Sequence, residues 1–393
     1  MIDFDHVIDR HGTYCTQWDY VEDRFGEKGL LPFTISDMDI EYSPAIDKAL
    51  TNRLQHKILG YSRWKHVDFQ GAVVSWYKRR FDCVIESSNV FYSPSVMYSI
   101  SKFIELLSNP KEGILLLTPA YNAFYDVINN NNRRLICSSL IDDNGKYTID
   151  FVDFERKCSE ASIFILCSPH NPIGRIWNED ELKEIIRICS KHNVHILSDD
   201  IHMDIDYQHK FNPIYKYELP SNIEIVICSS ISKSFNVPAL SGSYCIIKNE
   251  MLRDKFETIT RYRDFVNSPA ILHIIATIAA YGESEEWLEE LLIYLKKNLD
   301  YTKDYLKDNI PELYFEMPEG CYFAWINFKQ LHITSSQFQE ALIHIGKVAI
   351  MPGNSYGIDG EFYLRFHVGC SLEKVKEGLE RIKKTVEYVK ENY

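Results

Sequence analysis

The stretch from Ser229 to Gly242 reads SSISKSFNVPALSG and follows the apolar run Ile223–Cys228. The run predicts a buried strand, and the small and hydroxyl residues after it predict a loop. That loop carries one lysine, Lys233, with no carboxylate close to it in the sequence. An amine just past a buried strand suits a Schiff base with a carbonyl compound. A solvated loop lysine is the alternative, so the interpretation depends on residues elsewhere in the chain.

Chemically useful side chains also follow other predicted strands. The pairs are Ile114–Thr118 followed by Tyr121, Ile163–Cys167 followed by Asn171, and His195–Ser198 followed by Asp199. The repeated order of strand, loop, helix and strand predicts an α/β fold with a mostly parallel sheet and covering helices. Ligands of such sheets bind beyond the carboxyl ends of the strands. We therefore expect these three side chains and Lys233 to share one site.

The sequence pattern changes after about Pro269, where longer helical segments are followed by short strands. This change predicts a second, smaller α+β domain, which the N-terminal segment completes. We predict an N-terminal segment over residues 1–45, a large domain over 46–285 and a small C-terminal domain over 286–393.

Composition excludes several classes of protein. The 393-residue chain has a net charge of −13, which disfavours binding to nucleic acid or anionic lipid. No apolar run approaches the roughly 20 residues of a membrane span, and the N-terminus has no apolar signal core. The ten cysteines form no CxxC pair, and Asp37 with Asp39 is better explained as a solvated loop than as a metal site. We therefore predict a cytoplasmic enzyme with reduced thiols and no metal.

The residues at the strand ends fit an aromatic aldehyde cofactor with a pyridine ring. A carboxylate such as Asp199 could keep the ring nitrogen protonated, so that the ring accepts electrons. Tyr121 could stack on the ring, and Asn171 could donate a hydrogen bond to its phenolate oxygen. Taken one at a time, each residue has an ordinary structural explanation, so the prediction rests on their occurring together.

Other positions suit a cofactor phosphate and a substrate carboxylate. A helix is predicted from Pro94 to about Leu107, and its first turn, with Ser95, is a potential anion site. Ser230 could add a hydroxyl. Arg365, within the predicted strand Phe362–Phe366, could bind a substrate carboxylate through two hydrogen bonds.

Longer motifs resemble the pyridoxal-phosphate (PLP) enzymes of fold type I, in the class I/II aminotransferase family. The resemblance is stronger to the cystathionine β-lyase branch, which includes a lyase that also modulates a maltose regulon. It covers nearly the whole chain and rests on His11–Tyr20, Pro32–Asp39, Gly60–Trp64, Asn171–Pro172, Asp199–Asp204, Lys233–Asn236 and Ala349–Gly353.

The resemblance implies that Lys233 is both the Schiff-base lysine and the catalytic base. It implies a PLP site formed by Lys233, Asp199, Asn171, Tyr121, His202, Ser95, Val96, Ser230, Ser232 and Tyr61. It also implies that Arg365 binds the substrate carboxylate, with Tyr61 and Tyr121 nearby. Tyr61 is expected to reach the neighbouring subunit's site, which implies a homodimer.

Some positions depart from the pattern of related enzymes. Ser241 stands where many aminotransferases carry a phosphate-binding arginine, so its part in phosphate binding is left open. Asp200 replaces the branch's usual glutamate, and His367 replaces a common asparagine. These two changes could alter substrate fit without changing the core chemistry.

The implied activity is β-elimination, in which L-cystathionine or a related S-substituted cysteine yields a thiol, pyruvate and ammonia. With cystathionine the thiol is homocysteine. An aminotransferase of the same fold is one alternative, because it needs the same Lys233 and Asp199. A regulatory protein that binds a maltose-type transcription activator is another. The sequence leaves open the preferred sulfur amino acid, any transamination side activity and any regulatory role.

Overall fold

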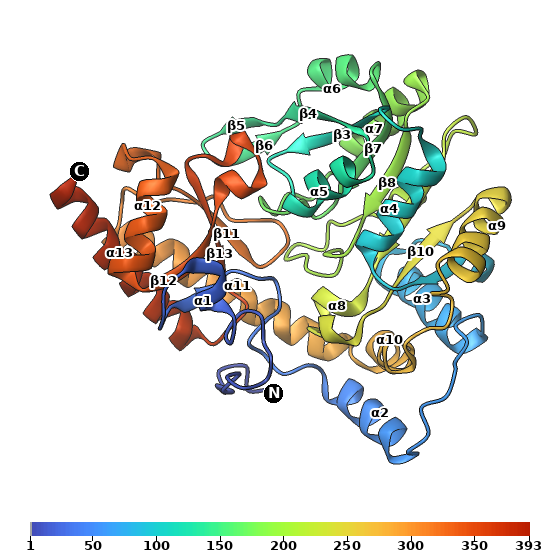
Figure 1. Ribbon diagram of the computed structural model, residues 1–393, viewed down its shortest axis with the longest axis horizontal. Coiled ribbons are helices and arrows are strands. Elements are labelled where there is room, and N and C mark those ends of the chain that lie inside the picture. Colours follow the sequence, from blue (N-terminus) through green and yellow to red (C-terminus); the bar gives the residue numbers. More distant parts are fainter. Residues whose placement is uncertain (1) are drawn as a thin grey trace.

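The computed structural model describes residues 2–393, and its main element is a seven-stranded sheet (Figure 1). Neighbouring strands in this sheet run parallel, with one exception: β10 runs antiparallel to both of its neighbours. From one edge the order is β4 (Arg134–Ser139), β3 (Gly113–Thr118), β7 (Ala161–Cys167), β8 (His195–Asp199), β9 (Ile225–Ser229), β10 (Ser243–Ile247) and β2 (Val90–Ser93).

Helices cover this sheet, which explains why its central strands are buried along almost their whole length. Helix α4 (Val96–Leu107) packs on β7 to β10, α6 (Phe151–Cys158) packs on β4 and β7, and α7 (Glu179–His192) packs on β8. The remaining helices of this part are α2 (Pro44–Gln55), α3 (Val67–Phe81), α5 (Asn122–Asn130), α8 (Ile231–Ser234), α9 (Glu250–Thr258) and α10 (Ile271–Glu283). A two-stranded hairpin joins β5 (Ile141–Asp143) to β6 (Lys146–Thr148).

A second sheet combines the two ends of the chain. Its order is β1 (Leu31–Phe33), β12 (Val348–Pro352), β13 (Tyr363–His367) and β11 (Phe323–Asn327). Strand β1 runs parallel to β12, with Leu31 opposite Val348. Figure 1 shows the N-terminal helix α1 (Val21–Phe25) beside the C-terminal elements. These are α11 (Glu285–Asn309), α12 (Ser335–Ala341) and α13 (Leu372–Asn392).

Helix α13 packs against the elements of this second sheet through a regular stripe of apolar side chains. Val375, Leu379, Ile382, Val386 and Val389 are buried at the spacing of one helix face. The N-terminal segment therefore packs with C-terminal elements, while the exact domain boundaries at 45 and 285 stay a prediction.

The local predictions are confirmed in part. Asn178 and Glu181 form the expected reciprocal capping box of α7. The helix predicted from Pro94 begins two residues later, because Ser95 is the extended N-cap residue whose hydroxyl accepts from the backbone of Tyr98. The expectation that Lys233 lies on a loop is wrong, because Ser230 caps a short helix, α8, that contains the lysine. No helix among residues 2–393 combines the length and apolarity of a membrane span.

Candidate active site

A cavity of about 230 Å³ opens at the carboxyl ends of β3, β7, β8 and β9. These strands are neighbours in the sheet, so the residues that follow them lie close together. Nine of the predicted site residues line the cavity: Lys233, Asp199, Asn171, Tyr121, His202, Ser95, Val96, Ser230 and Ser232. Two predicted residues, Arg365 and Tyr61, do not line it.

Lys233 presents its amine to this cavity. Its Nζ donates a hydrogen bond to the hydroxyl oxygen of Ser36, 2.6 Å away. Burial lowers the pKa of Lys233 to about 8; the charges of Asp37 and Asp199 oppose this change and that of Arg365 adds to it. A substantial fraction of the amine is therefore neutral near physiological pH, as a nucleophile or base requires.

Asp199 ends β8 and is buried beside the lysine. Burial raises the pKa of its carboxyl to about 7, although the amide of Ile201, at 3.1 Å, and the charge of Lys233 act in the opposite direction. The next residue, Asp200, is also buried, and burial raises its pKa to about 8. One oxygen of Asp200 accepts from the hydroxyl of Ser198, while the other has no hydrogen-bond partner among residues 2–393.

Asn171 connects the cavity to Arg365. It lies in the bend 168–174 after β7, and its Oδ1 accepts from an Arg365 nitrogen at 3.2 Å. Arg365 lies on β13 and also donates to the carbonyl oxygen of Thr34 at 2.7 Å. Its guanidinium carbon lies 4.1 Å from the ring centroid of Phe323, and its Nε has no hydrogen-bond partner in the described part of the chain. The second sheet therefore supplies the arginine next to the site.

One end of the cavity is formed by two capped helix starts. The Ser95 hydroxyl accepts from the amide of Tyr98 at 3.1 Å, while Val96 begins helix α4. The Ser230 hydroxyl accepts from the amide of Ser232 at 3.1 Å and donates to the carbonyl of Gly242 at 2.7 Å. Both hydrogen bonds of the Ser230 hydroxyl are therefore made within the chain, which the sequence did not indicate.

Two aromatic rings complete the lining. Tyr121 precedes α5, and its ring meets that of Phe124 edge-on with centroids 5.5 Å apart. His202 is buried, and its ring meets Tyr322 edge-on at 5.7 Å. Burial lowers the pKa of His202 to about 3, and the charges of Lys233 and Arg365 act in the same direction, so the imidazole is neutral.

Tyr61 does not join the site within its own chain. Its side chain is fully exposed, at 102% of the reference area, in a segment between α2 and α3. The same segment is anchored by Trp64, whose Nε1 donates to Asn267 at 2.8 Å. The role predicted for Tyr61 in a neighbouring subunit therefore stays a prediction.

The structure adds residues that sequence reasoning did not single out. They are Ser36, Met97, Cys167, Ile201, Pro238 and Gly242, which line the cavity together with Pro94 and Ser241. For Ser36 no local pattern signals the contact, because it lies 197 positions before Lys233.

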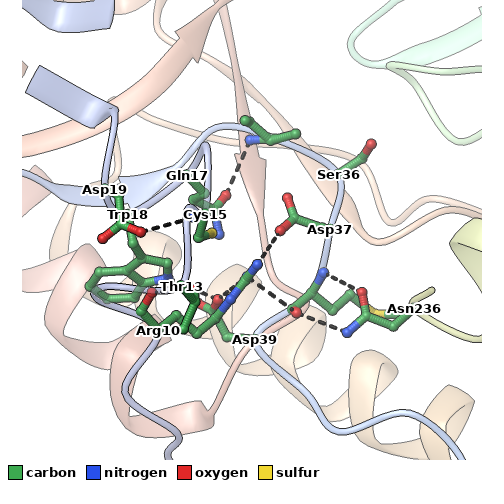
Figure 2. Close-up of polar contacts among 12 residues, drawn as sticks. Arg10, Thr13, Cys15, Gln17, Trp18, Asp19, Ser36, Asp37, Asp39 and Asn236 are labelled. Atoms are coloured by element: carbon green, nitrogen blue, oxygen red, sulfur yellow. Dashed lines mark hydrogen bonds and ion pairs between the residues drawn. The ribbon is translucent and has the colours of Figure 1, made fainter. Parts of the chain in front are cut away.

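The loop containing Asp37 and Asp39 also differs from the prediction. It is not a solvated loop: Arg10 bonds both carboxylates, at 2.5 Å and 2.7 Å (Figure 2). Asp39 also pairs with Lys374 of α13 and accepts from the indole of Trp18. Both acids are mostly buried, and their ion pairs join the N-terminal segment to the last helix.

The family model described as aminotransferase class I and II matches residues 28–382. The chain belongs to this family. It is 42% identical to the protein MalY of Escherichia coli over 96% of this chain and 97% of that protein. It is 32% identical to the cystathionine beta-lyase PatB of Bacillus subtilis, over 97% of this chain and 99% of that protein.

Solved structures agree with this family. A PLP-bound putative aminotransferase from Clostridium difficile superposes with a TM-score of 0.94 at 36% identity, covering 98% of this chain and 99% of that one. The PLP-bound C-S lyase from Staphylococcus hominis gives 0.91 at 28% identity, covering 98% of both chains. The prediction of fold type I and of PLP as cofactor is confirmed.

The geometry of the cavity fits PLP. Lys233 offers an amine whose neutral form is populated near physiological pH. Asp199 offers a buried carboxyl with a raised pKa, and a protonated ring nitrogen would supply the cationic partner that this carboxyl lacks. The start of α4 offers the amides of Val96 and Met97, which precede the first intrahelical hydrogen bond and suit a phosphate. The residues present therefore supply a partner for the aldehyde, the ring and the phosphate.

Proposed function

We propose that this protein is a PLP-dependent C–S β-lyase that cleaves L-cystathionine or a related S-substituted cysteine. The observation that carries this proposal is the position of Lys233, whose amine shares one cavity with Asp199 and lies near Arg365. Full-length relatives named cystathionine beta-lyase and a C-S lyase of the same fold confirm the predicted reaction class. The choice among sulfur amino acids is part of the proposal.

The residues divide the work of holding the cofactor. Asp199 would keep the pyridine nitrogen protonated, and Asn171 would donate to the phenolate oxygen. Tyr121 would pack on the ring. The phosphate would lie at the start of α4, near Ser95 and Val96. Ser232, His202 and Ser230 line the same cavity, with the Ser230 hydroxyl serving as a helix cap.

The substrate would bind through its carboxylate and react at Cα. Arg365 would take the carboxylate with two parallel hydrogen bonds, since its Nε is free of partners within residues 2–393. Lys233, once its amine is neutral and free, would remove the Cα proton. PLP, when bound, supplies a protonated ring that accepts the electron pair left at Cα.

Loss of the Cα proton leads to cleavage at the neighbouring carbon. The Cβ–S bond breaks, and its electron pair leaves with the sulfur as a thiolate. The remaining three-carbon fragment is hydrolysed to pyruvate and ammonia. With cystathionine the thiol product is homocysteine.

Pyruvate formation tests the function directly. The purified protein with PLP should release equal amounts of thiol and pyruvate from cystathionine without any added keto acid. Lys233→Ala should release neither, and borohydride should no longer fix PLP to the chain. A strict requirement for a keto acid would support the aminotransferase instead.

We further propose a homodimer in which Tyr61 of one subunit enters the site of the other. A second, wider cavity of about 1090 Å³ also reaches Lys233, next to the N-terminal segment. The segment that carries Tyr61 exposes apolar neighbours as well, with Ile58 at 65% and Leu59 at 59%. An exposed aromatic and aliphatic segment together with an open cavity at the lysine supports exchange of this segment between subunits.

Two finer proposals follow from the sequence analysis. All ten cysteines are unpaired, which supports a reducing compartment such as the cytoplasm. The second proposal is a transcription activator as partner, for which no contact within residues 2–393 marks a binding surface. A pull-down with a maltose-type activator, with wild type and Lys233→Ala in parallel, tests that partner; binding by both proteins would make the interaction independent of catalysis.

A further inference from the structure

The hydrogen bond between Lys233 and Ser36 joins two distant parts of the chain at the reacting amine. Lys233 Nζ donates to Ser36 Oγ at 2.6 Å, and Ser36 lines the same cavity as the lysine. The backbone of Ser36 is also fixed, because the hydroxyl of the buried Tyr322 donates to its carbonyl oxygen at 2.7 Å. Asp37 and Asp199 are the acidic groups whose charges act on this amine, and Arg365 is the basic one.

Asn236 ties the serine segment to the lysine segment. Its Oδ1 accepts from the amide of Met38 at 2.9 Å. Its Nδ2 donates to the carbonyls of Met38, at 2.9 Å, and Ile40, at 2.6 Å. Asn236 lies three residues after Lys233, so these hydrogen bonds link the segment of the lysine to the segment of its acceptor; Figure 2 shows the bonds of Asn236.

Ion pairs also hold the segment from Ser36 to Asp39. Figure 2 shows Arg10 reaching the carboxylates of both Asp37 and Asp39. Lys374 of α13 pairs with Asp39 as well. Ion pairs and backbone hydrogen bonds thus fix the segment from Ser36 to Asp39. An exposed surface loop has fewer such contacts.

We propose that Ser36 is a positioning residue that accepts a hydrogen bond from Lys233 whenever its amine is free of the cofactor, and so holds the base in place for Cα proton transfer. The inference rests on the proposed function, because it assigns a role within that reaction. A neutral amine can donate one N–H to Ser36 and still keep its lone pair to take a proton. Limiting the motion of a long, flexible lysine side chain lowers the entropic cost of proton transfer.

The full chain stripped of PLP tests the contact without catalysis. The rate at which PLP attaches to Lys233, followed by absorbance across pH, reports the fraction of neutral amine. The Ser36 oxygen stabilises the charged ammonium, so Ser36→Ala should move the midpoint to lower pH by about half a unit or more. Ser36→Thr keeps a hydroxyl and should restore the midpoint.

Exchange of the Cα proton of L-alanine in D2O, followed by NMR, tests the role. Alanine has no leaving group, so the exchange is measurable whether or not the protein cleaves C–S bonds. Ser36→Ala should slow the exchange about tenfold or more at saturating alanine, and Ser36→Thr should recover most of it. The proposal requires both the shifted midpoint and the slower exchange. The absence of either in Ser36→Ala overturns it, whereas missing pyruvate release would count only against the lyase.

Discussion

At the residue scale, burial changes the titration of the acid and the base of the site in opposite directions. It lowers the pKa of Lys233 to about 8 and raises that of Asp199 to about 7. Both groups therefore change protonation near neutral pH, which is common for functional groups and rare for surface ones. Arrival of a cationic ring nitrogen would lower the pKa of Asp199 again, so the cofactor itself completes the charge balance.

Replacing Arg365 tests the assigned carboxylate site. Arg365→Lys should raise KM for cystathionine about tenfold or more, because a lysine lacks the planar pair of donors that fits a carboxylate. The absorbance of bound PLP should change little, since Lys233 is retained. S-substituted cysteamine, which lacks the carboxylate, serves as the control and should react equally poorly with both proteins. An unchanged KM would place the carboxylate elsewhere.

Replacing Asp200 tests the consequence of its burial. Its pKa is raised to about 8, so the folded state keeps a proton that the unfolded state releases above about pH 4. Stability is then lost as pH rises across that window. Asp200→Asn carries no charge and escapes this loss, so its advantage in Tm over wild type should grow by about 2–4 °C or more between pH 5 and pH 8.

Thermal unfolding followed by circular dichroism at the two pH values measures this difference. Asp308→Asn, which removes an exposed carboxylate on α11, is the matched control and should show no such growth. An equal change in Tm at both pH values for Asp200→Asn would contradict the assignment of a protonated, buried acid.

Some of the site residues could be predicted from the sequence and others could not. Tyr121, Asn171, Asp199 and Lys233 were predictable because each follows an apolar run, and parallel strands bring such positions to one edge. Ser36 was not, because its contact with Lys233 joins positions 197 residues apart in the sequence. The pattern of charges around Asp39 could not reveal its partners either, since Arg10 and Lys374 come from opposite ends of the chain.

At the scale of elements, caps and strand ends set where the site residues lie. The sequence predicted the existence of the central strands and helices, because burial on both faces of β7 and β8 requires continuous apolar runs. It missed α8, because a helix of four residues has no periodicity to detect. The hydroxyl cap at Ser230, and not an apolar stripe, determines that turn.

The capping box of α7 gives a prediction at this scale. Asn178→Ala removes the acceptor for the amide of Glu181, a bond of 2.9 Å. We expect a loss of about 1 kcal/mol in the free energy of unfolding. Urea unfolding measures the change, and Asn178→Asp, which keeps an acceptor, should stay close to wild type. A loss of the same size in both variants would show that the cap contributes nothing specific.

At the scale of the whole molecule, mixing inactive subunits tests whether Tyr61 acts across a dimer. Lys233→Ala and Tyr61→Ala should each be weak or inactive alone. In a mixed dimer, one of the two sites combines an intact Lys233 with an intact Tyr61 from the other chain. Refolding an equal mixture should recover about a quarter of wild-type activity, because half the dimers are mixed and half their sites are complete. No recovery would place Tyr61 within its own subunit's site, and full activity of Tyr61→Ala alone would place it outside any site.

The parallel pairing of β1 with β12 has a consequence for how the protein is made. Leu31 leaves the ribosome 317 residues before its partner Val348. At roughly 5–20 residues per second, this strand waits about 15–60 s for the strand beside it. The large sheet can assemble during that wait, whereas the N-terminal strand cannot. The apolar N-terminal segment therefore stays unpaired until Val348 emerges, and a chaperone that shields nascent chains would find a binding site there.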